Sequence, residues 1–233
     1  MKAIILAGGM GKRLKPITDY VPKPLVPINN IPIIEWQIRY FKKFGMKNFV
    51  ICSGYKNSQI ENYFNSRNLG VNIEHSVEKT PLGTGGAIKN ASRFIDDENF
   101  FVINGDVITD LNPKLLQSKP NSIAVIPLRT MFGVVDVVGD EIRQFQEKSH
   151  VTGQWMNAGV YWLSKEIIKY LPKKGNIEDS TFSTFATKGH LFAIRYHDVF
   201  WYSIDSHKDI EECTKNIKSR KYANFLDGKN SKK

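Results

Sequence analysis

Apolar positions in the first part of the chain alternate between short runs and helical spacing. The short runs have the length and residue types of strands, and they cover Lys2–Leu6, Asn48–Cys52, Val71–His75 and Phe100–Ile103. Apolar residues recur at helical intervals from Ile34 to Phe44, which predicts an amphipathic helix over Ile31–Phe44 with Gly45 as its stop signal. Further helices are expected at Ser58–Phe64 and, after a glycine-rich turn, from Ala87 to Phe94.

This alternation is typical of a mostly parallel sheet covered by helices. Phe100–Ile103 is apolar throughout, so we expect it at the centre of the sheet, buried on both faces. Strand-like runs then follow one another and predict an antiparallel addition; they cover Ser122–Leu128, Val134–Val138, Glu141–Phe145 and Gly159–Leu163. The remaining predicted elements are two short helices, a strand and a final helix, at Lys165–Tyr170, Ser180–Thr187, Leu191–Tyr196 and from about Lys208.

Length and composition fit one globular domain. The chain has 233 residues, of which 41% are hydrophobic, enough for a buried core. No apolar run approaches the roughly 18 to 20 residues of a membrane span, and the N-terminal run ends in glycines instead of a signal-peptide cleavage pattern. We therefore expect a cytoplasmic protein. Only Cys52 and Cys213 occur, which excludes a disulfide scaffold and a CxxC zinc site.

The net charge of +10 is concentrated near the end of the chain. Seven basic residues and one acidic residue give the segment Thr214–Lys233 a charge of +6. We expect a domain over residues 1–217 and a basic, solvated tail over residues 218–233. No aromatic interleaving or nucleic-acid motif accompanies this charge, which argues against a nucleic acid as partner.

A glycine-rich loop, Leu6-Ala7-Gly8-Gly9-Met10-Gly11-Lys12-Arg13-Leu14, follows the first predicted strand. An open α/β sheet places its ligand at this position, and glycines let backbone N–H groups approach phosphates. A dinucleotide fingerprint would need glycine at Leu14, and a P-loop would need glycine at Leu6 and Ser or Thr at Arg13, so both are excluded. The loop delivers Arg13, and Lys23 follows between two prolines. These two cations suit a triphosphate, although an isolated Lys23 would more often be a solvated lysine.

The loop and the segment Pro22-Lys23-Pro24-Leu25-Val26-Pro27-Ile28 closely resemble the N-terminal signature of sugar-phosphate nucleotidylyltransferases, and above all the mannose- and heptose-1-phosphate guanylyltransferases. The resemblance continues in the family's order to about Ile217, through Pro81-Leu-Gly-Thr-Gly-Gly-Ala, Asn104-Gly-Asp, Phe132-Gly-Val-Val, Phe145-Gln-Glu-Lys and Asn157-Ala-Gly-Val-Tyr. It implies a Rossmann-like three-layer α/β/α sandwich with a mixed, mostly parallel central sheet and a small antiparallel sugar-binding extension.

The resemblance also implies a reaction. A sugar 1-phosphate would attack the α-phosphorus of a nucleoside triphosphate and release pyrophosphate, with Mg²⁺ as cofactor. Arg13, Lys23 and Asp106 would be the catalytic residues, and Asp106 would hold the metal. A carboxylate just after a buried strand suits this role, although capping the following turn is a common alternative for Asp.

The second metal carboxylate departs from the commonest pattern of the family. Many members have Asp-Ile-Gly-Thr where this chain has Ser203-Ile204-Asp205-Ser206, so that Ser203 replaces the Asp. Glucose-1-phosphate cytidylyltransferases instead have their Asp at the position of Asp205. The resemblance therefore implies Asp205 as the second metal ligand. The alternative is that Asp205 only stabilises the start of the last helix.

The substrate residues are implied in the same way. The nucleotide site would comprise Leu6, Ala7, Gly8, Gly9, Gly11, Arg13, Glu78, Pro81, Gly83 and Thr84. The sugar-phosphate site would comprise Lys23, Gly133, Glu147, Lys148 and Asn157, with Glu147 and Lys148 ending one strand and Asn157 beginning the next. A carboxylate can accept both adjacent donors of guanine, so Glu78 favours GTP.

Two alternatives stay open from the sequence. The chain could be a cytidylyl- or uridylyltransferase of the same family, or a catalytically silent regulatory subunit that binds a nucleotide sugar. Regulatory relatives tend to lose the loop arginine or the metal aspartate, and both Arg13 and Asp106 are present. The expected partners are a nucleoside triphosphate and a sugar 1-phosphate, and the sequence does not decide between a monomer and a homo-oligomer.

Overall fold

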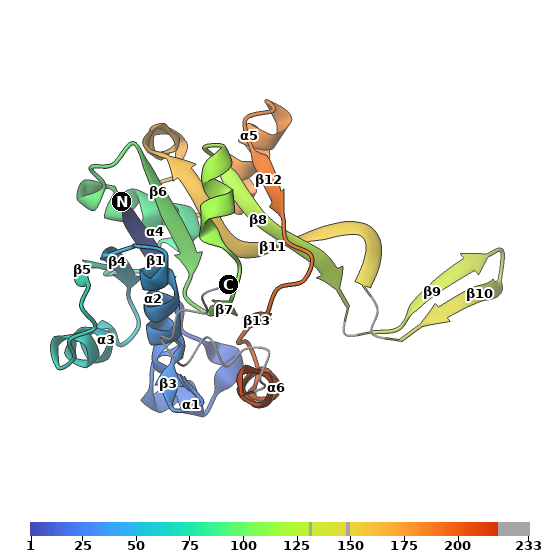
Figure 1. Ribbon diagram of the computed structural model, residues 1–233, viewed down its shortest axis with the longest axis horizontal. Coiled ribbons are helices and arrows are strands. Elements are labelled where there is room, and N and C mark those ends of the chain that lie inside the picture. Colours follow the sequence, from blue (N-terminus) through green and yellow to red (C-terminus); the bar gives the residue numbers. More distant parts are fainter. Residues whose placement is uncertain (131, 148–149, 219–233) are drawn as a thin grey trace, which may run out of the picture.

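A seven-stranded mixed sheet forms the centre of the molecule (Figure 1). The computed structural model describes residues 1–130, 132–147 and 150–218. The strands of the sheet run in the order β12-β8-β11-β6-β1-β4-β5, with bounds Phe192–Arg195, Ser122–Arg129, His150–Ser164, Asn99–Asn104, Lys2–Ala7, Asn48–Ser53 and Asn72–Val77. β1 pairs in parallel with β4 and β6, β4 with β5, and β8 with β12, whereas β11 is antiparallel to both of its neighbours. The predicted mixed, mostly parallel sheet is confirmed, and β6 lies at its middle as expected.

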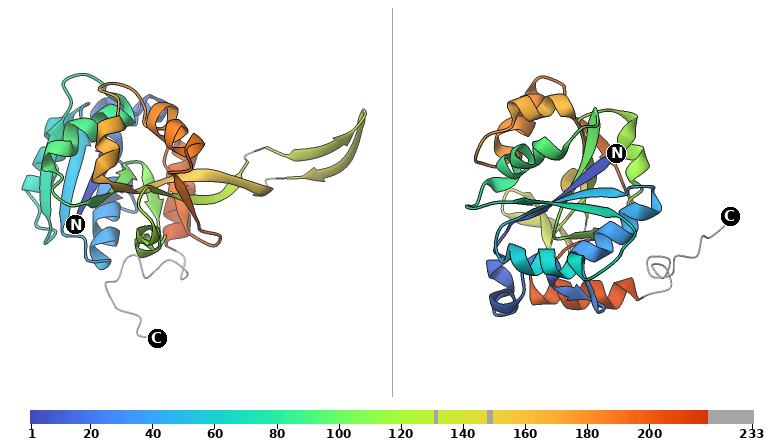
Figure 2. Two further views of the ribbon diagram at one scale, coloured as in Figure 1. Left: turned by 90° about the horizontal axis from the view of Figure 1, so that it is seen from above. Right: turned by 90° about the vertical axis from the view of Figure 1, so that its left-hand side faces the viewer.

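Side chains that alternate along β1 build two separate cores. Ala3 and Ile5 face one side of the sheet and Ile4 faces the other, because successive strand residues point to opposite faces. The first core is covered by α2 and α3, and the second by α4 and α5; their bounds are Ile33–Lys43, Asn57–Asn65, Gly83–Ala91 and Ser183–Thr187. The views in Figure 2 show helices on both faces of the sheet. The predicted three-layer sandwich is therefore confirmed.

The helix predicted over Ile31–Phe44 begins two residues later than expected. Ile31–Pro32 forms the strand β3, which pairs with β2 (Pro27–Ile28) in a hairpin. Asn29 and Asn30 both have positive φ, 49° and 66°, which is the backbone of a tight two-residue hairpin turn. The apolar stripe of the helix is buried as predicted, with Ile34, Ile38 and Phe41 on the sheet.

The antiparallel part of the chain is divided between the main sheet and a separate ribbon. β8 and β11 belong to the main sheet, whereas β9 (Val134–Val138) and β10 (Glu141–Gln146) pair only with each other. β11 begins at His150, much earlier than the predicted Gly159, and breaks in register after Asn157. The prediction that Asn157 begins a strand is therefore wrong, because pairing with β8 extends β11 beyond its most apolar part.

A third core joins the beginning and the end of the chain. Trp36 of α2 packs there with Phe200, Ile204 and Cys213. The short strand β13 (Trp201–Ser203) pairs with β7 (Val107–Thr109), and the final helix α6 (His207–Ile217) follows within one residue of its predicted start. Lys218 ends the part of the chain that the structure describes, and the rest of the predicted basic tail lies outside the described residues.

Short helical turns complete the described structure. Short 3₁₀ helices lie at Lys12–Leu14, Lys23–Leu25, Ser92–Phe94, Pro113–Ser118 and Lys165–Tyr170, and a four-residue helix α1 spans Ile17–Tyr20. A π-helical turn at Glu178–Phe182 leads into α5. Both cysteines are free and buried. Across the described ranges, no helix combines the length and the apolar composition that crossing a membrane requires.

Candidate active site

Two adjoining pockets open where β1 and β6 end. One, of about 220 Å³, is lined by the glycine loop, Arg13, Lys23, Asp106 and Asp205. The other, of about 320 Å³, extends past Asp106 to Glu78 and Thr84. Leu6, Gly9, Gly105 and Asp106 line both. The structure therefore brings together all of the residues predicted for the nucleotide and the metal. We call the first the charged pocket and the second the Glu78 pocket.

Close contact between two strand ends places Asp106 beside the loop. The backbone N–H of Gly105 donates to the carbonyl oxygen of Leu6 at 2.9 Å. A Cβ atom on residue 105 would lie 2.4 Å from that same oxygen, so only glycine permits this approach. Asp106 is thereby fixed at the carboxyl end of the central strand, next to the residues that follow β1.

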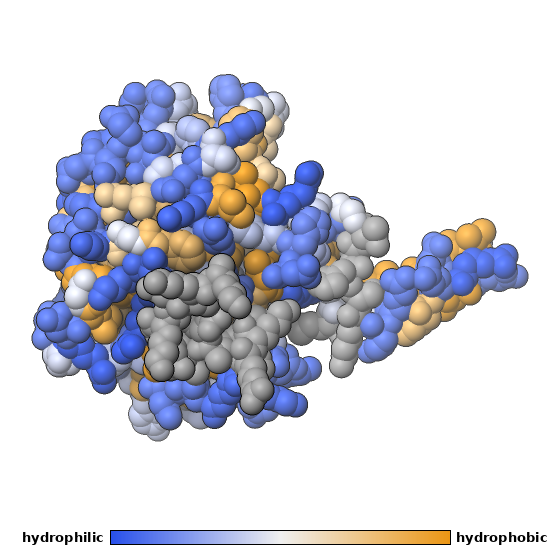
Figure 3. All heavy atoms as spheres, in the orientation of Figure 1, coloured by the Kyte–Doolittle hydropathy of each residue, from blue (hydrophilic) through white to orange (hydrophobic). Residues whose placement is uncertain are grey.

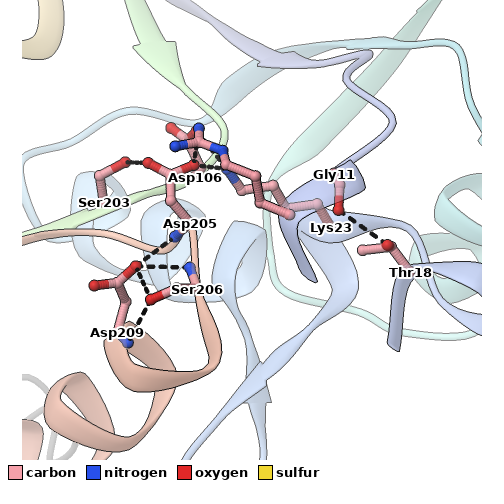
Figure 4. A network of polar contacts seen from close by, with 9 residues as sticks. Gly11, Thr18, Lys23, Asp106, Ser203, Asp205, Ser206 and Asp209 are labelled. Carbon is pink, nitrogen blue, oxygen red and sulfur yellow. Dashed lines mark hydrogen bonds and ion pairs between the residues drawn. The ribbon is translucent and has the colours of Figure 1, made fainter. Parts of the chain in front are cut away.

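Lys23 bridges the two carboxylates of the charged pocket (Figure 4). Its ammonium donates to Asp106 Oδ2 at 2.8 Å and to Asp205 Oδ1 at 2.7 Å, and its side chain is only 13% exposed. Arg13 donates to the same Asp205 oxygen at 2.7 Å, with 76% of its side chain exposed. Two cations and two carboxylates from distant parts of the sequence thus form one cluster at the mouth of the cleft.

Both carboxylates are held by the backbone segments that carry them. The N–H of Ile204 donates to the carbonyl oxygen of Asp106 at 2.9 Å and so joins the two segments. Asp209 accepts the N–H groups of Asp205 and Ser206, at 2.9 and 2.7 Å, and Ser206 caps α6. The side chain of Asp205 takes no part in this cap and instead accepts hydrogen bonds from Lys23, Arg13 and Ser203.

The ionised form of Asp205 is favoured by its neighbours. Burial by itself would raise the pKa of this carboxyl, but the hydrogen bond and charge of Lys23, a hydrogen bond from Ser203 Oγ at 2.9 Å and the charge of Arg13 outweigh it. The net pKa is lowered. Ser203, which replaces the aspartate of many relatives, therefore contributes by orienting and stabilising the neighbouring carboxylate.

Gln37 is a site residue that the sequence analysis missed. Its Nε2 donates to the carbonyl oxygens of Asn104 and Val107, both at 2.7 Å, and so clamps the two ends of the turn that carries Asp106. The side chain is buried, and its Oε1 has no hydrogen-bond partner among the described residues. One signal was present in the sequence: a polar residue stands within the apolar face of a helix, beside Ile34 and Ile38.

Glu78 lines the second pocket together with Gly8 and Pro81. It is half-buried, and its Oε2 accepts the N–H of Leu82 at 3.1 Å. Burial raises the pKa of this carboxyl, and the bond from Leu82 lowers it by less. A Cβ atom on Gly8 would lie 2.9 Å from Glu78 Oε1, so the glycine makes room for the carboxylate.

The glycines that follow Pro81 serve chain packing. Gly85 and Gly86 both donate their N–H groups to the carbonyl oxygen of Gly175, at 3.0 and 3.2 Å. A Cβ atom on Gly83 would lie 2.6 Å from that oxygen. The small residues thus bring the start of α4 against the segment 172–176.

A chain of polar contacts links the Glu78 pocket to β11. Thr84 Oγ1 donates to Glu178 at 2.6 Å, Tyr161 donates to the same carboxylate at 3.4 Å, and Asn157 Nδ2 donates to the Tyr161 hydroxyl at 2.8 Å. Asn157 is thus connected to Thr84 through Glu178 and Tyr161. Tyr161 ends the motif that begins at Asn157, whereas nothing in the local sequence marked Glu178, because its contacts exist only once the π-helical turn packs against α4 and β11.

The other predicted sugar residues lie away from the two pockets. Gly133 and Glu147 are exposed neighbours at the root of the β9–β10 ribbon, and neither lines these pockets. Lys148 lies outside the described residues. Of the predicted sugar-phosphate residues, Lys23 lies in the charged pocket, and Asn157 is connected to Thr84 by hydrogen bonds. Gly133 and Glu147 lie outside both pockets.

The charged pocket suits a small divalent cation. No group of three or more His, Cys, Asp or Glu residues that could hold a metal ion occurs in the described ranges. The donors are two carboxylates, and Mg²⁺ is usually bound by one or two carboxylates together with substrate phosphates. The donor set fits that pattern, since a third protein ligand is not required.

Known proteins resemble this chain in sequence and in structure. A family model described as nucleotidyl transferase matches residues 2–220. D-glycero-alpha-D-manno-heptose 1-phosphate guanylyltransferase of Campylobacter jejuni is 40% identical over 173 residues, which cover 72% of this chain and 77% of the relative. The probable glucose-1-phosphate cytidylyltransferase of Bacillus subtilis is 31% identical over 244 residues, with 92% and 95% covered. HddC from Yersinia pseudotuberculosis, in complex with GMP-PN, has a TM-score of 0.73 at 28% identity and covers 93% of this chain and 99% of its own.

Proposed function

Because the chain belongs to the nucleotidyl transferase family, we propose that it transfers a nucleoside monophosphate, with GTP as the favoured donor, to a sugar 1-phosphate. One observation carries the proposal: Lys23 and Arg13 converge with Asp106 and Asp205 at the end of a glycine loop, beside a second pocket that Glu78 lines. The guanylyltransferase and cytidylyltransferase relatives act in this class by name.

The residues of the charged pocket would position and neutralise phosphates. A phosphate monoester has a second pKa near 6, so the attacking oxygen is already ionised near neutral pH and needs no general base. That oxygen forms a bond to the α-phosphorus as the bond from the α-phosphorus to the bridging oxygen breaks, and pyrophosphate leaves with the electron pair. The loop amides, Arg13 and Lys23 would offset the charge of the phosphates brought together.

Asp106 and Asp205 would hold Mg²⁺, and Lys23 would then turn its charge to phosphate oxygens. When bound, the cation supplies charge neutralisation to the phosphates. The two carboxylates are already fixed relative to each other by the bond between Ile204 and Asp106. Ser203 and Asp209 keep the Asp205 segment in place.

Glu78 is the basis for proposing guanine. Guanine presents two adjacent donors, N1–H and the exocyclic amine, and the carboxylate of Glu78 has Oε1 directed past Gly8 while Oε2 is held by Leu82. Cytidylyl transfer is the second candidate, because the Bacillus subtilis relative matches nearly the whole chain and Asp205 fits the pattern of such enzymes. A silent regulatory subunit is less well supported. Arg13, Lys23 and Asp106 are all present, and each of them forms an ion pair in the charged pocket.

The test is pyrophosphate release with Mg²⁺ across GTP, CTP, UTP, dTTP and ATP. Each would be paired with mannose-, glucose-, heptose- and N-acetylhexosamine 1-phosphates. We expect one preferred pair, with GTP as nucleotide, and loss of turnover in Asp106→Ala. Asp97→Ala is the matched control, because Asp97 precedes β6 and so lies at the opposite end of that strand. Binding of a nucleotide sugar without turnover in any pair would replace the proposal by the regulatory role.

A second variant tests the base. Glu78→Gln keeps the shape of the side chain and changes one carboxylate oxygen into a donor. We expect the ratio of kcat/KM for GTP to that for UTP to fall by about tenfold or more, a change of about 1.4 kcal/mol. An unchanged ratio would remove Glu78 from base recognition while leaving the transfer reaction itself intact.

A further inference from the structure

Lys23 lies between the two carboxylates of the charged pocket. Its Nζ is 2.8 Å from Asp106 Oδ2 and 2.7 Å from Asp205 Oδ1 (Figure 4). These distances are only about 0.7 Å longer than an Mg²⁺–oxygen bond of roughly 2.1 Å, so an ammonium and a divalent cation cannot share the same two oxygens. We propose that Lys23 competes with the divalent cation for these oxygens and releases them only when phosphates enter the pocket; this rests on the proposed role of Asp106 and Asp205 as metal ligands.

The hydrogen bonds of the two carboxylates single out Lys23 among their partners. Asp205 Oδ1 also accepts Arg13 at 2.7 Å, and Asp205 Oδ2 accepts Ser203 at 2.9 Å. Both oxygens of Asp205 are therefore engaged, and a cation that binds this residue must displace a donor. Displacing Lys23 frees an oxygen of Asp106 at the same time, because one ammonium holds both carboxylates. Release of Lys23 is thus the single step that opens both ligands.

The stem of Lys23 is held in place, whereas its end can rotate. Pro22 and Pro24 flank the residue and restrict its backbone. A Cβ atom on Gly11 would lie 3.0 Å from Lys23 Cβ and 3.6 Å from Lys23 Cδ, so the stem packs against the glycine loop that we propose to bind phosphates. The ammonium of lysine is a point charge on a flexible stem. Rotation of the end of the side chain is therefore enough to exchange a carboxylate for a phosphate oxygen.

Charge opposes the entry of a metal cation that is not accompanied by an anion. Three cations and two carboxylates line the charged pocket: Lys12, Arg13, Lys23, Asp106 and Asp205. A divalent cation would add to this net positive charge, whereas the phosphates of a nucleotide reverse it and attract the ammonium. Phosphates thus favour both the release of Lys23 and the binding of the metal. We therefore expect metal and nucleotide to bind cooperatively, each raising the affinity for the other.

Access from solvent does not limit the binding of a cation. The side chains of Asp106 and Asp205 are 31% and 27% exposed. Arg13 is largely exposed and lies just before α1, and the surface around α1, at the foot of the molecule, is mostly hydrophilic in Figure 3. Ions in solution therefore reach both carboxylates, and the competing ammonium is what weakens their binding.

The experiment is a titration of the nucleotide-free protein with Mn²⁺, a spectroscopic substitute for Mg²⁺, in which electron paramagnetic resonance measures the free ion. Lys23→Met removes the ammonium and keeps an unbranched stem. We expect this variant to bind Mn²⁺ at least about tenfold more tightly than the wild type, a change of about 1.4 kcal/mol. Lys12→Met is the matched control, because Lys12 lines the same pocket and forms no ion pair with a described residue. Loss of this exposed charge should change the Mn²⁺ affinity by less than about threefold.

Thermal unfolding with and without Mg²⁺ gives a second readout and shows that each variant is folded. In Lys23→Met the two carboxylates lose the ammonium that separates their charges, so Mg²⁺ should raise the melting temperature of this variant more than that of the wild type. Mn²⁺ binding by Lys23→Met that is no tighter than binding by the wild type or by Lys12→Met overturns the proposal. Tight binding that persists after Asp106→Asn is added to Lys23→Met also overturns it, because the ion would then lie elsewhere.

Pyrophosphate release by the wild type, measured separately, keeps this test distinct from the test of the proposed function. Turnover by the wild type together with equal Mn²⁺ affinities of wild type and Lys23→Met would support the transfer reaction and overturn the competition. Tight Mn²⁺ binding by Lys23→Met, without turnover by the wild type on any pair of substrates, would support the competition and overturn the transfer reaction.

Discussion

Replacing Gln37 by leucine removes two hydrogen bonds that hold the Asp106 turn and leaves every residue proposed to bind metal or substrate unchanged. The side chain is buried in α2, and its Nε2 is the donor to both carbonyl oxygens that flank Gly105 and Asp106. Leucine has a similar size and fits an apolar helix face. The substitution therefore leaves the core filled but leaves two buried carbonyl groups without this donor.

The expected loss follows from the two bonds. Each hydrogen bond contributes about 0.5–1.5 kcal/mol net, so their removal costs about 1–3 kcal/mol. Removing Oε1, which is buried without a described partner, offsets a part of this cost. For a chain of this length, about 2 kcal/mol lowers the melting temperature by about 4–8 °C. The freed turn should also raise the Mg²⁺ concentration needed for half-maximal activity, because Asp106 is less well positioned.

Two measurements check this prediction: thermal unfolding, and pyrophosphate release as a function of Mg²⁺ concentration. Gln59→Leu is the matched control, since Gln59 donates one exposed hydrogen bond to the carbonyl of Tyr20 at 3.1 Å. We expect that control to change stability by less than about 0.5 kcal/mol. If Gln37→Leu is no less stable than Gln59→Leu, or has an unchanged Mg²⁺ requirement, the clamp does not act as described.

Three further predictions rest on single contacts. Gly8→Ala should lower the ratio of kcat/KM for GTP to that for UTP, with little loss of stability, because its Cβ would lie 2.9 Å from Glu78 Oε1; a ratio equal to that of the wild type would contradict the contact. Gly105→Ala should lower stability by about 3 kcal/mol or more in thermal unfolding, because its Cβ would meet the Leu6 carbonyl oxygen at 2.4 Å and backbone cannot easily give way. Burial holds the pKa of His75 below its usual 6.5 despite the charge of Glu61, so on acidification the unfolded chain binds the proton before the folded chain does, and stability falls as the pH drops below about 6.5. His75→Gln should therefore show a smaller fall in melting temperature than the wild type between about pH 7.5 and about pH 5.5. An equal fall in both proteins would reject this role of His75.

Local pattern by itself determined most of the elements and the loop chemistry. The period of the apolar residues predicted α2 and, apart from β11, the predicted strands to within a few residues, because burial on one face imposes that period on the sequence. The glycines after β1 and the prolines around Lys23 marked the half of the cleft that we propose to bind phosphates, because glycine frees the backbone and proline restricts it wherever they stand. The family resemblance added Asp106, Asp205 and Glu78, and the fold brings all three to one cleft.

Tertiary structure alone decided the contacts between distant segments. Gln37 and Glu178 gain their partners only when α2 packs under the Asp106 turn and the π-helical turn packs against α4, and no local pattern encodes such pairs. Pairing with β8 extended β11. β9 and β10 pair only with each other and project from the rest of the molecule, with Gly133 and Glu147 at their root. The physical reason is that periodicity records only whether a position is buried, whereas which surface buries it depends on the packing of the whole chain.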